Sequence, residues 1–589
     1  MKNPEGIVRE INGPVVKGTN MASFKLNEIV TIGTHKLIGE VVSLDHDVAT
    51  MQVYEETEGL KAGEVINYTG SPLSVTLGPG MLGNIFDGIQ RPLEKIDQLH
   101  KNFIPDGIGL LSLDQEKLWS VSVKVVPGQV LQPGETYATV QETKSILHKL
   151  LVPQGISGTV LKSEPDGLYT LSDTIVTLQD QHDNRSFLTL SSKWPVRRPR
   201  PYSKRIPIYQ PLVTGQRVID SFFPIAKGGA VGLPGGFGTG KTVTQQQLAK
   251  WSDADIIIYI GCGERGNEMA DVLEEFPRLI DPRTDRPLME RTILIANTSN
   301  MPVAAREASI YTGVTMAEYY RDMGYDVAIM ADSTSRWAEA LREISGRLEE
   351  MPAEEGFPAY LPSRLAEFYE RAGCVQTLAG SEASITIIGA VSPPGGEFSE
   401  PVTENTKRFV TAFMALDKKL AYARHYPAIN YLLSYSGYVE MLKDWYEENV
   451  AEDMLSLRKK MLRLLQEEDK LNEIVQLVGE DVLPNDQALV LEIARIIKKG
   501  FLQQNALHKV DTYVTLEKQY KMMRVIDTLY ESALKCVKLG IPLSVIKSQD
   551  VVQEVLKMKY EVPNDDIEML DGLCTKIAQA YSLLSREYE

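Results

Sequence analysis

The chain has 589 residues, which corresponds to about four domains of ordinary size. Apolar residues make up 43% and charged residues 24% of the sequence, a composition that argues against disorder, a collagen-like structure and a disulfide scaffold. The net charge of −17 argues against a general nucleic-acid binder, since affinity for phosphate backbones needs clustered positive charge.

The sequence shows no membrane-spanning segment, no signal peptide and no cysteine pattern typical of metal sites or disulfides. No stretch approaches about 18 uninterrupted apolar residues, so no transmembrane helix is expected. No apolar region follows Lys2, so no signal peptide is expected. The four cysteines lie far apart and form no CxxC pattern, which argues against zinc or disulfides. We therefore expect a cytoplasmic protein with reduced thiols.

The first two hundred residues are rich in short strands. Residues 1–70 alternate β-rich runs with Gly, Asn and Asp turn signals, which predicts a small closed barrel. Residues 111–195 form a second strand-rich block with Gly and Pro punctuation. It ends in the basic, proline-rich stretch 195–201, which predicts a boundary linker, although a solvated loop is equally compatible.

The remainder changes from an alternating to a helical pattern. Short apolar strands alternate with helical stretches up to about residue 435, which is typical of βαβ units and a mostly parallel sheet. Apolar residues then recur every three or four positions. We predict a barrel (1–70), an α/β phosphate-loop nucleotide-binding domain (71–110 and 196–435), an inserted β-rich domain (111–195) and a C-terminal helical domain (436–589).

Residues 235–242 match the phosphate-loop pattern G-x-x-x-x-G-K-[ST], between a predicted strand, 230–233, and a predicted helix, 243–251. Glycines allow backbone N–H groups to converge on phosphate oxygens. The lysine neutralises the β- and γ-phosphates, and the threonine hydroxyl is a ligand for Mg²⁺. The pattern predicts a nucleotide site formed by Gly235, Gly236, Phe237, Gly238, Thr239, Gly240, Lys241, Thr242 and Val243.

Two carboxylates follow predicted strands of the same domain. Asp332 ends an apolar strand, where such a residue completes the Mg²⁺ shell directly or through water. Glu264 follows another strand, where it would orient and polarise the attacking water. Arg265 would hold Glu264 ionised or contact phosphate. On the residues alone, a surface Glu–Arg pair is an equally good interpretation of positions 264 and 265.

These motifs leave several classes open, namely kinases, helicases, GTPases and rotary ATPases. No [NT]-K-x-D guanine signature follows at a suitable place, so GTP is disfavoured. Longer stretches are more specific. The sequence resembles the catalytic A subunit (alpha chain) of V-type and A-type rotary ATPases, nearest the bacterial and archaeal branch, over residues 77–80, 87–93, 214–220, 232–242, 261–268, 297–307, 324–342 and 399–403.

The resemblance implies an assembly as well as a fold. Copies of the chain would alternate with non-catalytic B subunits in a hexamer, with the barrels in a crown. The insertion would bind peripheral-stalk subunits, and the helical domain would press on a central rotating shaft. The B subunit would supply an arginine finger, a contribution of about 10³–10⁵ in rate, so the chain alone would be nearly inactive. ATP hydrolysis would drive the transport of H⁺ or Na⁺ through a separate membrane sector, and ion flow in the other direction would drive ATP synthesis. The chain would be linked to the membrane only indirectly, through that sector.

The resemblance also assigns roles residue by residue. Lys241 would contact the β- and γ-phosphates of ATP, and Thr242 and Asp332 would hold Mg²⁺. Glu264 would position the lytic water, and Arg265 would support that site.

Two positions depart from the family pattern. Gly236 stands where relatives often have Pro, so a more flexible loop is expected. The family stacks adenine between an aromatic of an H-[FY]-P-x-I-N segment, here Tyr426, and one of an L-Q-Q-N-A-F segment, where this chain has Leu507. Losing one face of the stack costs about 0.5–1.5 kcal/mol, so weaker or less base-selective binding is expected.

Three other functions share part of this pattern. An RNA-translocating hexameric ATPase shares the barrel and the phosphate loop but needs a basic RNA path, which the net charge does not indicate. A secretion or flagellar-export ATPase would lack the strand-rich insertion. A non-catalytic B-type subunit is disfavoured by the intact phosphate loop and by Glu264.

Overall fold

The computed structural model describes residues 5–101, 104–105, 107, 111–479 and 482–588. The chain divides into two compact units, each assembled from three segments. Unit 1 comprises Met1–Pro207, Gly228–Gly232 and Ala254–Val410, and unit 2 comprises Ile208–Lys227, Leu233–Asp253 and Thr411–Glu589.

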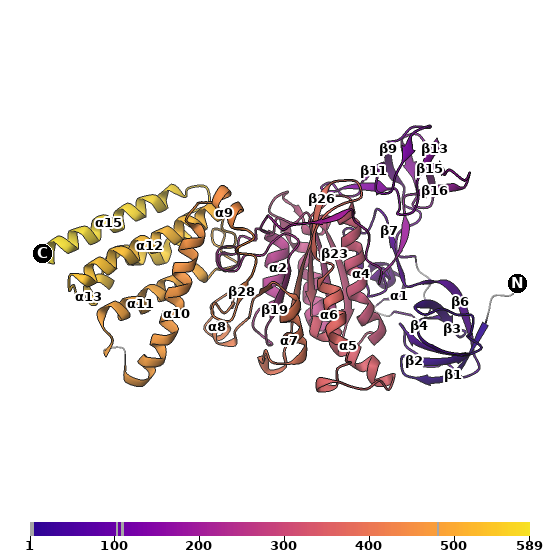
Figure 1. Ribbon diagram of the computed structural model, residues 1–589, viewed down its shortest axis with the longest axis horizontal. Helices are drawn as coiled ribbons and strands as arrows, with labels where there is room; N and C mark the ends of the chain where they lie inside the picture. Colours follow the sequence, from indigo (N-terminus) through magenta and orange to yellow (C-terminus); the bar gives the residue numbers. More distant parts are fainter. Residues whose placement is uncertain (1–4, 102–103, 106, 108–110, 480–481, 589) are drawn as a thin grey trace. The chain divides into compact units, whose positions relative to one another are not determined.

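Unit 1 begins with the closed barrel that the sequence predicts, drawn in indigo in Figure 1. Its strands follow the order β1-β2-β5-β4-β3-β6 and point alternate apolar side chains inward. Val16, Val30 and Ile66 are fully buried in its core. The strands are β1 (Glu5–Asn12), β2 (Val15–Thr19), β3 (Glu28–Ile32), β4 (Leu37–Asp45), β5 (Val48–Val53) and β6 (Val65–Pro72).

The inserted region consists of two four-stranded antiparallel sheets, β10-β13-β15-β16 and β12-β11-β9-β14. It confirms the predicted strand-rich block. A short ladder between β7 (Ser74–Leu77) and β17 (Ser192–Pro195) follows it. The inserted strands are β9 (Trp119–Val123), β10 (Val130–Leu131), β11 (Thr136–Gln141), β12 (Leu147–Leu151), β13 (Gly158–Ser163), β14 (Gly167–Tyr169), β15 (Thr174–Gln179) and β16 (Arg185–Thr189).

Glu142 fastens the insertion to the rest of unit 1. Its Oε1 accepts hydrogen bonds from the backbone N–H groups of Gly80, Met81 and Leu82 at 2.7, 3.0 and 3.1 Å. Its Oε2 lies 2.7 Å from Nδ1 of His148. The pKa of this buried carboxyl lies below its usual value, because the attraction of His148 and these hydrogen bonds outweigh the desolvation that would raise it.

The basic, proline-rich stretch after β17 is paired rather than solvated. The Arg197 guanidinium lies between Glu40 of β4, at 3.1 Å, and Glu307, at 2.8 Å. Arg200 pairs with Asp322 at 2.7 Å. These arginines therefore bind the linker to the barrel and to a long helix, a role that their charge alone does not indicate.

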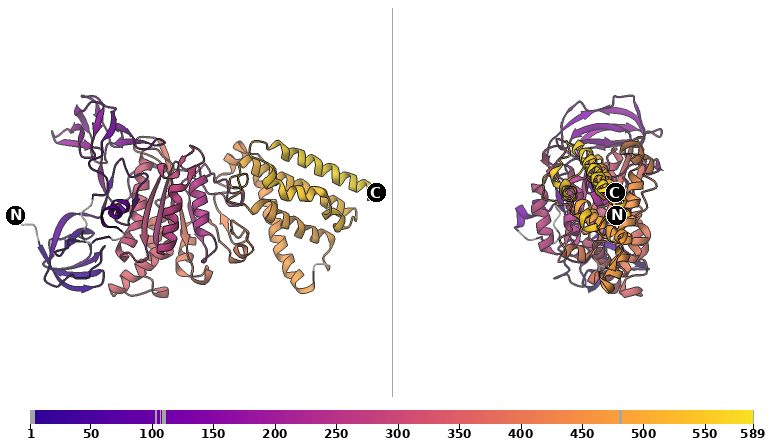
Figure 2. Two further views of the ribbon diagram at one scale, coloured as in Figure 1. Left: turned by 180° about the vertical axis from the view of Figure 1, so that it is seen from behind. Right: turned by 90° about the vertical axis from the view of Figure 1, so that its left-hand side faces the viewer.

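The centre of unit 1 is a parallel sheet in the order β26-β24-β20-β23-β8, with helices beside its strands (Figure 2). β20 (Ile256–Glu264) is buried along its whole length, as expected for a sheet covered on both faces. The other strands are β8 (Ile85–Phe86), β18 (Lys204–Ile206), β21 (Ile280–Asp281), β22 (Arg286–Pro287), β23 (Thr292–Thr298), β24 (Val327–Asp332), β25 (Gly373–Gln376) and β26 (Glu382–Val391).

The helices of unit 1 include α4 (Val303–Asp322), which is buried over nearly its whole length and packs on four strands of the sheet. This burial explains why it shows so little amphipathic pattern in the sequence. The others are α1 (Leu93–His100), α3 (Gly266–Glu275), α5 (Thr334–Arg347), α6 (Leu361–Tyr369) and α7 (Pro401–Phe409).

Unit 2 combines the phosphate-loop segment with the C-terminal helices. β19 (Ala230–Pro234) runs into it from unit 1, and a hairpin joins β27 (Ala412–Phe413) to β28 (Tyr435–Ser436). Gly479 caps α10 at φ +90°. The helices are α2 (Lys241–Trp251), α8 (Lys418–Tyr422), α9 (Lys443–Asn449), α10 (Met454–Val478), α11 (Asn485–Ile496), α12 (Leu516–Lys538), α13 (Leu543–Lys547), α14 (Asp550–Glu561) and α15 (Glu568–Tyr588), with π-helical turns η1 (Val218–Phe222) and η7 (Ile497–Leu502).

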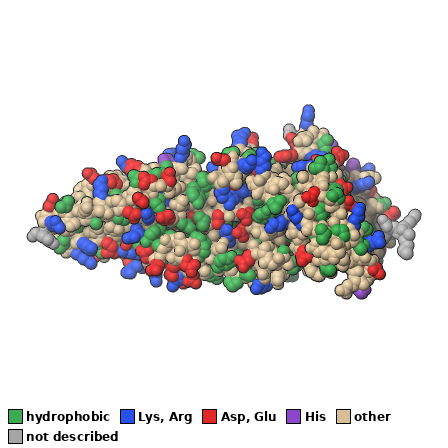
Figure 3. All heavy atoms as spheres, turned by 90° about the horizontal axis from the view of Figure 1, so that it is seen from above, with side chains coloured by type: hydrophobic (Ala, Val, Ile, Leu, Met, Phe, Trp, Pro, Cys, Tyr) green, Lys and Arg blue, Asp and Glu red, His purple; other side chains and the backbone are tan. Residues whose placement is uncertain are grey.

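The surface carries charges of both signs, and the four cysteines are thiols. Acidic and basic side chains are interspersed over the face drawn in Figure 3. None of the four cysteines, all of which lie in the described part of the chain, forms a disulfide. Among the described residues, no helix is both long enough and apolar enough to span a bilayer.

Candidate active site

The phosphate loop lies in unit 2, between β19 and α2. Gly238 and Gly240 adopt φ angles of +77° and +85°, which glycine reaches without a steric cost. The Thr239 hydroxyl donates to the Gly236 carbonyl at 2.8 Å, and Lys241 Nζ donates to the Gly235 carbonyl at 2.9 Å. The lysine ammonium thus lies over the loop that it follows in the sequence.

The helix after the loop begins at Lys241, two residues before the predicted start. Left-handed Gly240 is its N-cap and ends the loop abruptly, so Lys241, Thr242 and Val243 form the first turn. The N–H groups of a first turn have no acceptor inside the helix, and together with the helix dipole they favour an anion. The side chains of Phe237 and Val243 are exposed, whereas that of Thr239 is buried.

Tyr426 flanks this loop within unit 2. A Cβ atom on Gly240 would lie 3.4 Å from Cε1 of the Tyr426 ring, and the Tyr426 side chain is 43% exposed. The Gln504 N–H donates to the Tyr426 carbonyl at 2.8 Å, so the segment just before Leu507 contacts the segment of Tyr426. Leu507 itself is 95% exposed. The structure therefore brings Tyr426 to the phosphate loop and places Leu507 on a surface nearby.

In unit 1, Glu264 and Asp332 end two adjacent parallel strands. Glu264 is the last residue of β20 and Asp332 the last of β24, and the register pairs Gly261 with Asp332. Their exposed fractions are 8% and 3%. The carboxyl ends of parallel strands form the edge at which such sheets bind ligands. The predicted pair of carboxylates therefore shares one edge of the sheet.

Tyr259 is a hydrogen-bond partner of Asp332. Its hydroxyl donates to Asp332 Oδ2 at 3.1 Å. Burial, and then the negative charge of Asp332, raises the pKa of Tyr259 well above its usual value. Tyr259 therefore stays protonated and remains a hydrogen-bond donor. Nearby, burial raises the pKa of the Cys262 thiol to about 12, so this cysteine is not a nucleophile.

Three arginines lie near the end of β20, where Glu264 is the last residue. Arg265 is exposed and caps α3. Arg306 of α4 is buried and donates to the Ser299 carbonyl at 2.8 Å, and Glu264 is among the carboxylates that raise the pKa of Arg336. A Cβ atom on Gly263, at φ +74°, would lie 2.6 Å from Cδ of Arg306 and 2.9 Å from Cβ of Arg336. The glycine therefore makes room for both side chains.

The sequence analysis assigns no role at this edge to Tyr259, Arg306 or Arg336. Tyr259 lies inside an apolar strand, where a tyrosine is unremarkable. Arg336 lies four residues beyond Asp332 on the first turn of α5, and that proximity was the available signal.

Each of the two predicted Mg²⁺ ligands, one in each unit, carries an oxygen donor. Thr242 offers a hydroxyl oxygen on the first turn of α2, and Asp332 offers a buried carboxylate. Oxygen donors in small number, with substrate phosphates supplying others, are what Mg²⁺ prefers in nucleotide sites. Within the described residues no group of three or more His, Cys, Asp or Glu side chains forms a metal cluster, so a site made of protein ligands alone is not observed.

Family models match four successive regions. The ATP synthase alpha/beta family beta-barrel domain matches residues 8–70, and the barrel-sandwich domain of ATP synthase alpha/beta subunits matches 110–197. The nucleotide-binding domain of the same family matches 215–436. The C-terminal domain of V and A type ATP synthase matches 443–546.

Relatives match over almost the whole chain. The V-type ATP synthase alpha chain 2 of Clostridium tetani is 63% identical over 583 residues, which is 99% of this chain and 98% of that one. The A subunit of the A-type ATP synthase of Methanopyrus kandleri is 55% identical over 99% of each chain. Among solved structures, the ATPase EscN of the enteropathogenic E. coli type III secretion system has a TM-score of 0.62 at 21% identity, covering 88% of this chain and 99% of that one, a likeness of fold alone.

Proposed function

We propose that this chain, which belongs to the family of V-type ATP synthase alpha chains and A-type ATP synthase A subunits, is the catalytic subunit of a rotary ATPase. It hydrolyses or synthesises ATP and couples that reaction to H⁺ or Na⁺ transport through a separate membrane sector. The observation that supports this most directly is the pair of buried carboxylates, Glu264 and Asp332, at one sheet edge of a chain that also has a complete phosphate loop.

The reaction is an in-line attack of water on the γ-phosphate, in which positioning and charge stabilisation supply most of the rate. Glu264 orients the water and accepts its proton, and Arg265 supports that carboxylate. Lys241 and the amides of residues 235–243 hold the β- and γ-phosphates. Thr242 and Asp332 would hold Mg²⁺, which neutralises developing phosphate charge when it is bound. Tyr426 forms one face of the adenine site, and Leu507 lies on the other side.

The proposed partners follow the family pattern. Copies of the chain alternate with B subunits, which contribute an arginine finger to each active site, and central-shaft and peripheral-stalk subunits complete the soluble sector. The chain is then cytoplasmic and peripheral to the membrane, and it binds no nucleic acid. The proposed domains are the barrel (1–70), the nucleotide-binding domain (71–110 and 196–435), the insertion (111–195) and the helical domain (436–589).

A secretion ATPase is the second candidate, because the likeness to EscN extends over most of this chain. That likeness concerns the fold, whereas the identity of more than half of all residues with ATP synthase subunits supports the rotary function.

Binding of Mg·ATP to the isolated chain, measured by calorimetry, tests the site. Lys241→Met should weaken binding about 10- to 100-fold, since a charge-assisted phosphate contact is lost. Glu264→Gln should leave affinity within about twofold, because its role is in the chemical step. Lys250→Met, on the same helix, is the matched control and should bind as the wild type does. Equal affinities of Lys241→Met and the wild type would refute the proposed phosphate site.

A further inference from the structure

The loop 503–513 lies between η7 and α12. It contacts both the segment of Tyr426 and the end of α2, the helix that follows the phosphate loop. At its start, the Gln504 N–H donates to the Tyr426 carbonyl at 2.8 Å. At its end, the Tyr513 ring stacks on Trp251, the last residue of α2, with 5.0 Å between ring centroids. Leu507 lies between these two contacts. The position of the loop therefore decides what faces Tyr426.

A buried arginine shapes the base of this loop. Nη1 of Arg217 lies 2.6 Å from Oδ1 of Asp511, and both side chains are fully buried. Nη2 of Arg217 donates to the Gln503 carbonyl at 2.8 Å, and Nε donates to that of Phe501. Asp511 Oδ2 in turn accepts the Asn505 N–H at 2.7 Å. A charged pair removed from water is favourable only with such complete hydrogen bonding.

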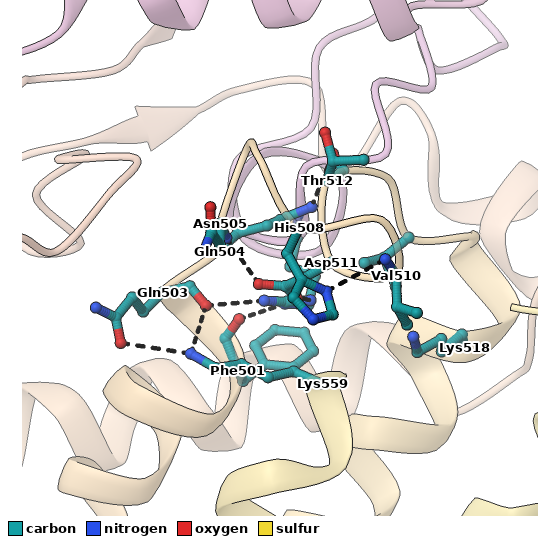
Figure 4. Close-up of polar contacts among 12 residues, drawn as sticks. Phe501, Gln503, Gln504, Asn505, His508, Val510, Asp511, Thr512, Lys518 and Lys559 are labelled. Atoms are coloured by element: carbon teal, nitrogen blue, oxygen red, sulfur yellow. Dashed lines mark hydrogen bonds and ion pairs between the residues drawn. The ribbon is translucent and has the colours of Figure 1, made fainter. Parts of the chain in front are cut away.

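The loop is also held from outside by the end of α14. Lys559 Nζ donates to the carbonyls of Lys499 and Gln503 at 2.6 and 3.1 Å, and Figure 4 shows its contact with Gln503. The Tyr560 ring lies 4.8 Å, centroid to centroid, from that of His508. Asn564 Nδ2 donates to the Tyr513 carbonyl at 2.9 Å. The segment 559–564 thus contacts the loop at its beginning, its middle and its end.

Lys559 is a buried lysine, and lysine side chains are rarely buried in folded proteins. Its exposed fraction is 3%, and burial lowers its pKa to about 8, with the nearby Arg217 acting in the same direction and Asp511 opposing it. Placing a second cation there is unfavourable unless backbone carbonyls compensate it. The residues of this segment lie beyond residue 546, where the match to the C-terminal domain model ends.

We propose that the segment 559–564 is a brace for the loop 503–513, and that Lys559 is a positioning residue for the adenine end of the nucleotide. The brace fixes the carbonyl of Gln503, and through Gln504 it fixes the distance between Leu507 and Tyr426. The helices after residue 546 are therefore coupled to nucleotide affinity. This inference rests on the proposed function, since it presumes that adenine lies beside Tyr426.

The test compares Lys559→Met with Lys557→Met, a more accessible lysine on the same helix, in the full chain. Calorimetry measures the affinity for Mg·ADP and for Mg·tripolyphosphate, which has no base. Lys559→Met should weaken Mg·ADP about 2- to 10-fold, the range of a partly lost apolar contact between Leu507 and the base, and leave tripolyphosphate unchanged. Amide hydrogen exchange of residues 503–513 should accelerate in Lys559→Met and not in Lys557→Met.

The other outcomes are equally informative. Unchanged Mg·ADP affinity in Lys559→Met would overturn the inference, even if the loop exchanges faster. A parallel loss of both ligands would show a general structural effect and would also overturn it. If Lys559→Met does not fold, Asn564→Ala takes its place with the same expectation. A wild type that binds tripolyphosphate but shows no added affinity for Mg·ADP would refute the proposed adenine site itself.

Discussion

Burial and neighbouring charges set the ionisation of single residues around the candidate site. His425, directly before Tyr426, has its pKa lowered to about 4 by burial, and further by the positive charges of Lys559 and Lys498. The backbone N–H of His425 donates to the Leu420 carbonyl at 2.9 Å, which holds the residue in place. The imidazole is therefore neutral at physiological pH.

His425 makes the stability of the chain depend on pH. In the unfolded chain its pKa is near 6.5, so between about pH 6.5 and 4 the unfolded state binds more protons and stability falls as pH falls. We predict that His425 contributes a loss of about 2 kcal/mol between roughly pH 7 and pH 5, and that His425→Gln removes this contribution from the pH dependence. Urea unfolding at both pH values measures it. His46→Gln, at an exposed histidine, should keep the wild-type dependence, and a His425→Gln variant that also keeps it would contradict the prediction.

Leu507 offers the second test at this scale. Leu507 is 95% exposed and follows, by three residues, the Gln504 N–H that donates to the Tyr426 carbonyl, so Leu507→Phe should supply an aromatic face and strengthen Mg·ADP binding about 2- to 10-fold. Calorimetry checks this, with Leu477→Phe, at another exposed leucine, as the control. Equal affinities of Leu507→Phe and the wild type would mean that position 507 does not face the base.

At the scale of elements, one carboxylate joins the inserted sheets to the strand region below them. Glu142 accepts three successive backbone N–H groups and pairs with His148, whose Nε2 in turn lies 2.9 Å from the Tyr319 hydroxyl on α4. The insertion is thereby anchored to both the loop before β8 and the main helix of unit 1. The Glu142 carboxylate takes part directly in the three backbone hydrogen bonds and in the pair with His148.

Glu142→Gln should loosen this anchor. The amide is a weaker acceptor than the carboxylate and brings a donor toward donors, so a local destabilisation of roughly 1–3 kcal/mol is expected. Amide hydrogen exchange at Gly80, Met81 and Leu82 should accelerate accordingly. Glu116→Gln, at an exposed position of the insertion, should leave these rates unchanged. Unaltered exchange in Glu142→Gln would show that the fold does not depend on the charge.

At the scale of the molecule, the sequence predicted the features that depend on local patterns and did not predict the contacts between residues far apart in the chain. The phosphate loop, the barrel and the parallel strands follow from glycine spacing and apolar runs, and the structure has them. The hydrogen bond between Tyr259 and Asp332 joins residues 73 apart, and Lys559 reaches Gln503 from another helix. Such pairs depend on the packing of elements, which no local pattern in a single sequence specifies.

The pairing of the linker arginines has the same explanation. Arg197 is paired because the barrel and α4 present Glu40 and Glu307 to it, and those residues lie 157 and 110 positions away. The need for a glycine at position 263 likewise comes from Arg306 and Arg336, whose side chains lie beside it in the fold. In both cases the residue type is visible in the sequence, whereas its partner is not.

The most direct test of the central claim is Mg²⁺-dependent ATP hydrolysis by the chain alone and by its mixture with a B subunit. We predict strong activity only in the mixture, since the arginine finger accounts for about 10³–10⁵ in rate, and loss of that activity in Glu264→Gln. Full activity of the chain alone, or a Glu264→Gln mixture as active as the wild type, would contradict a catalytic site shared between subunits. Stimulation by RNA would instead favour a translocating ATPase.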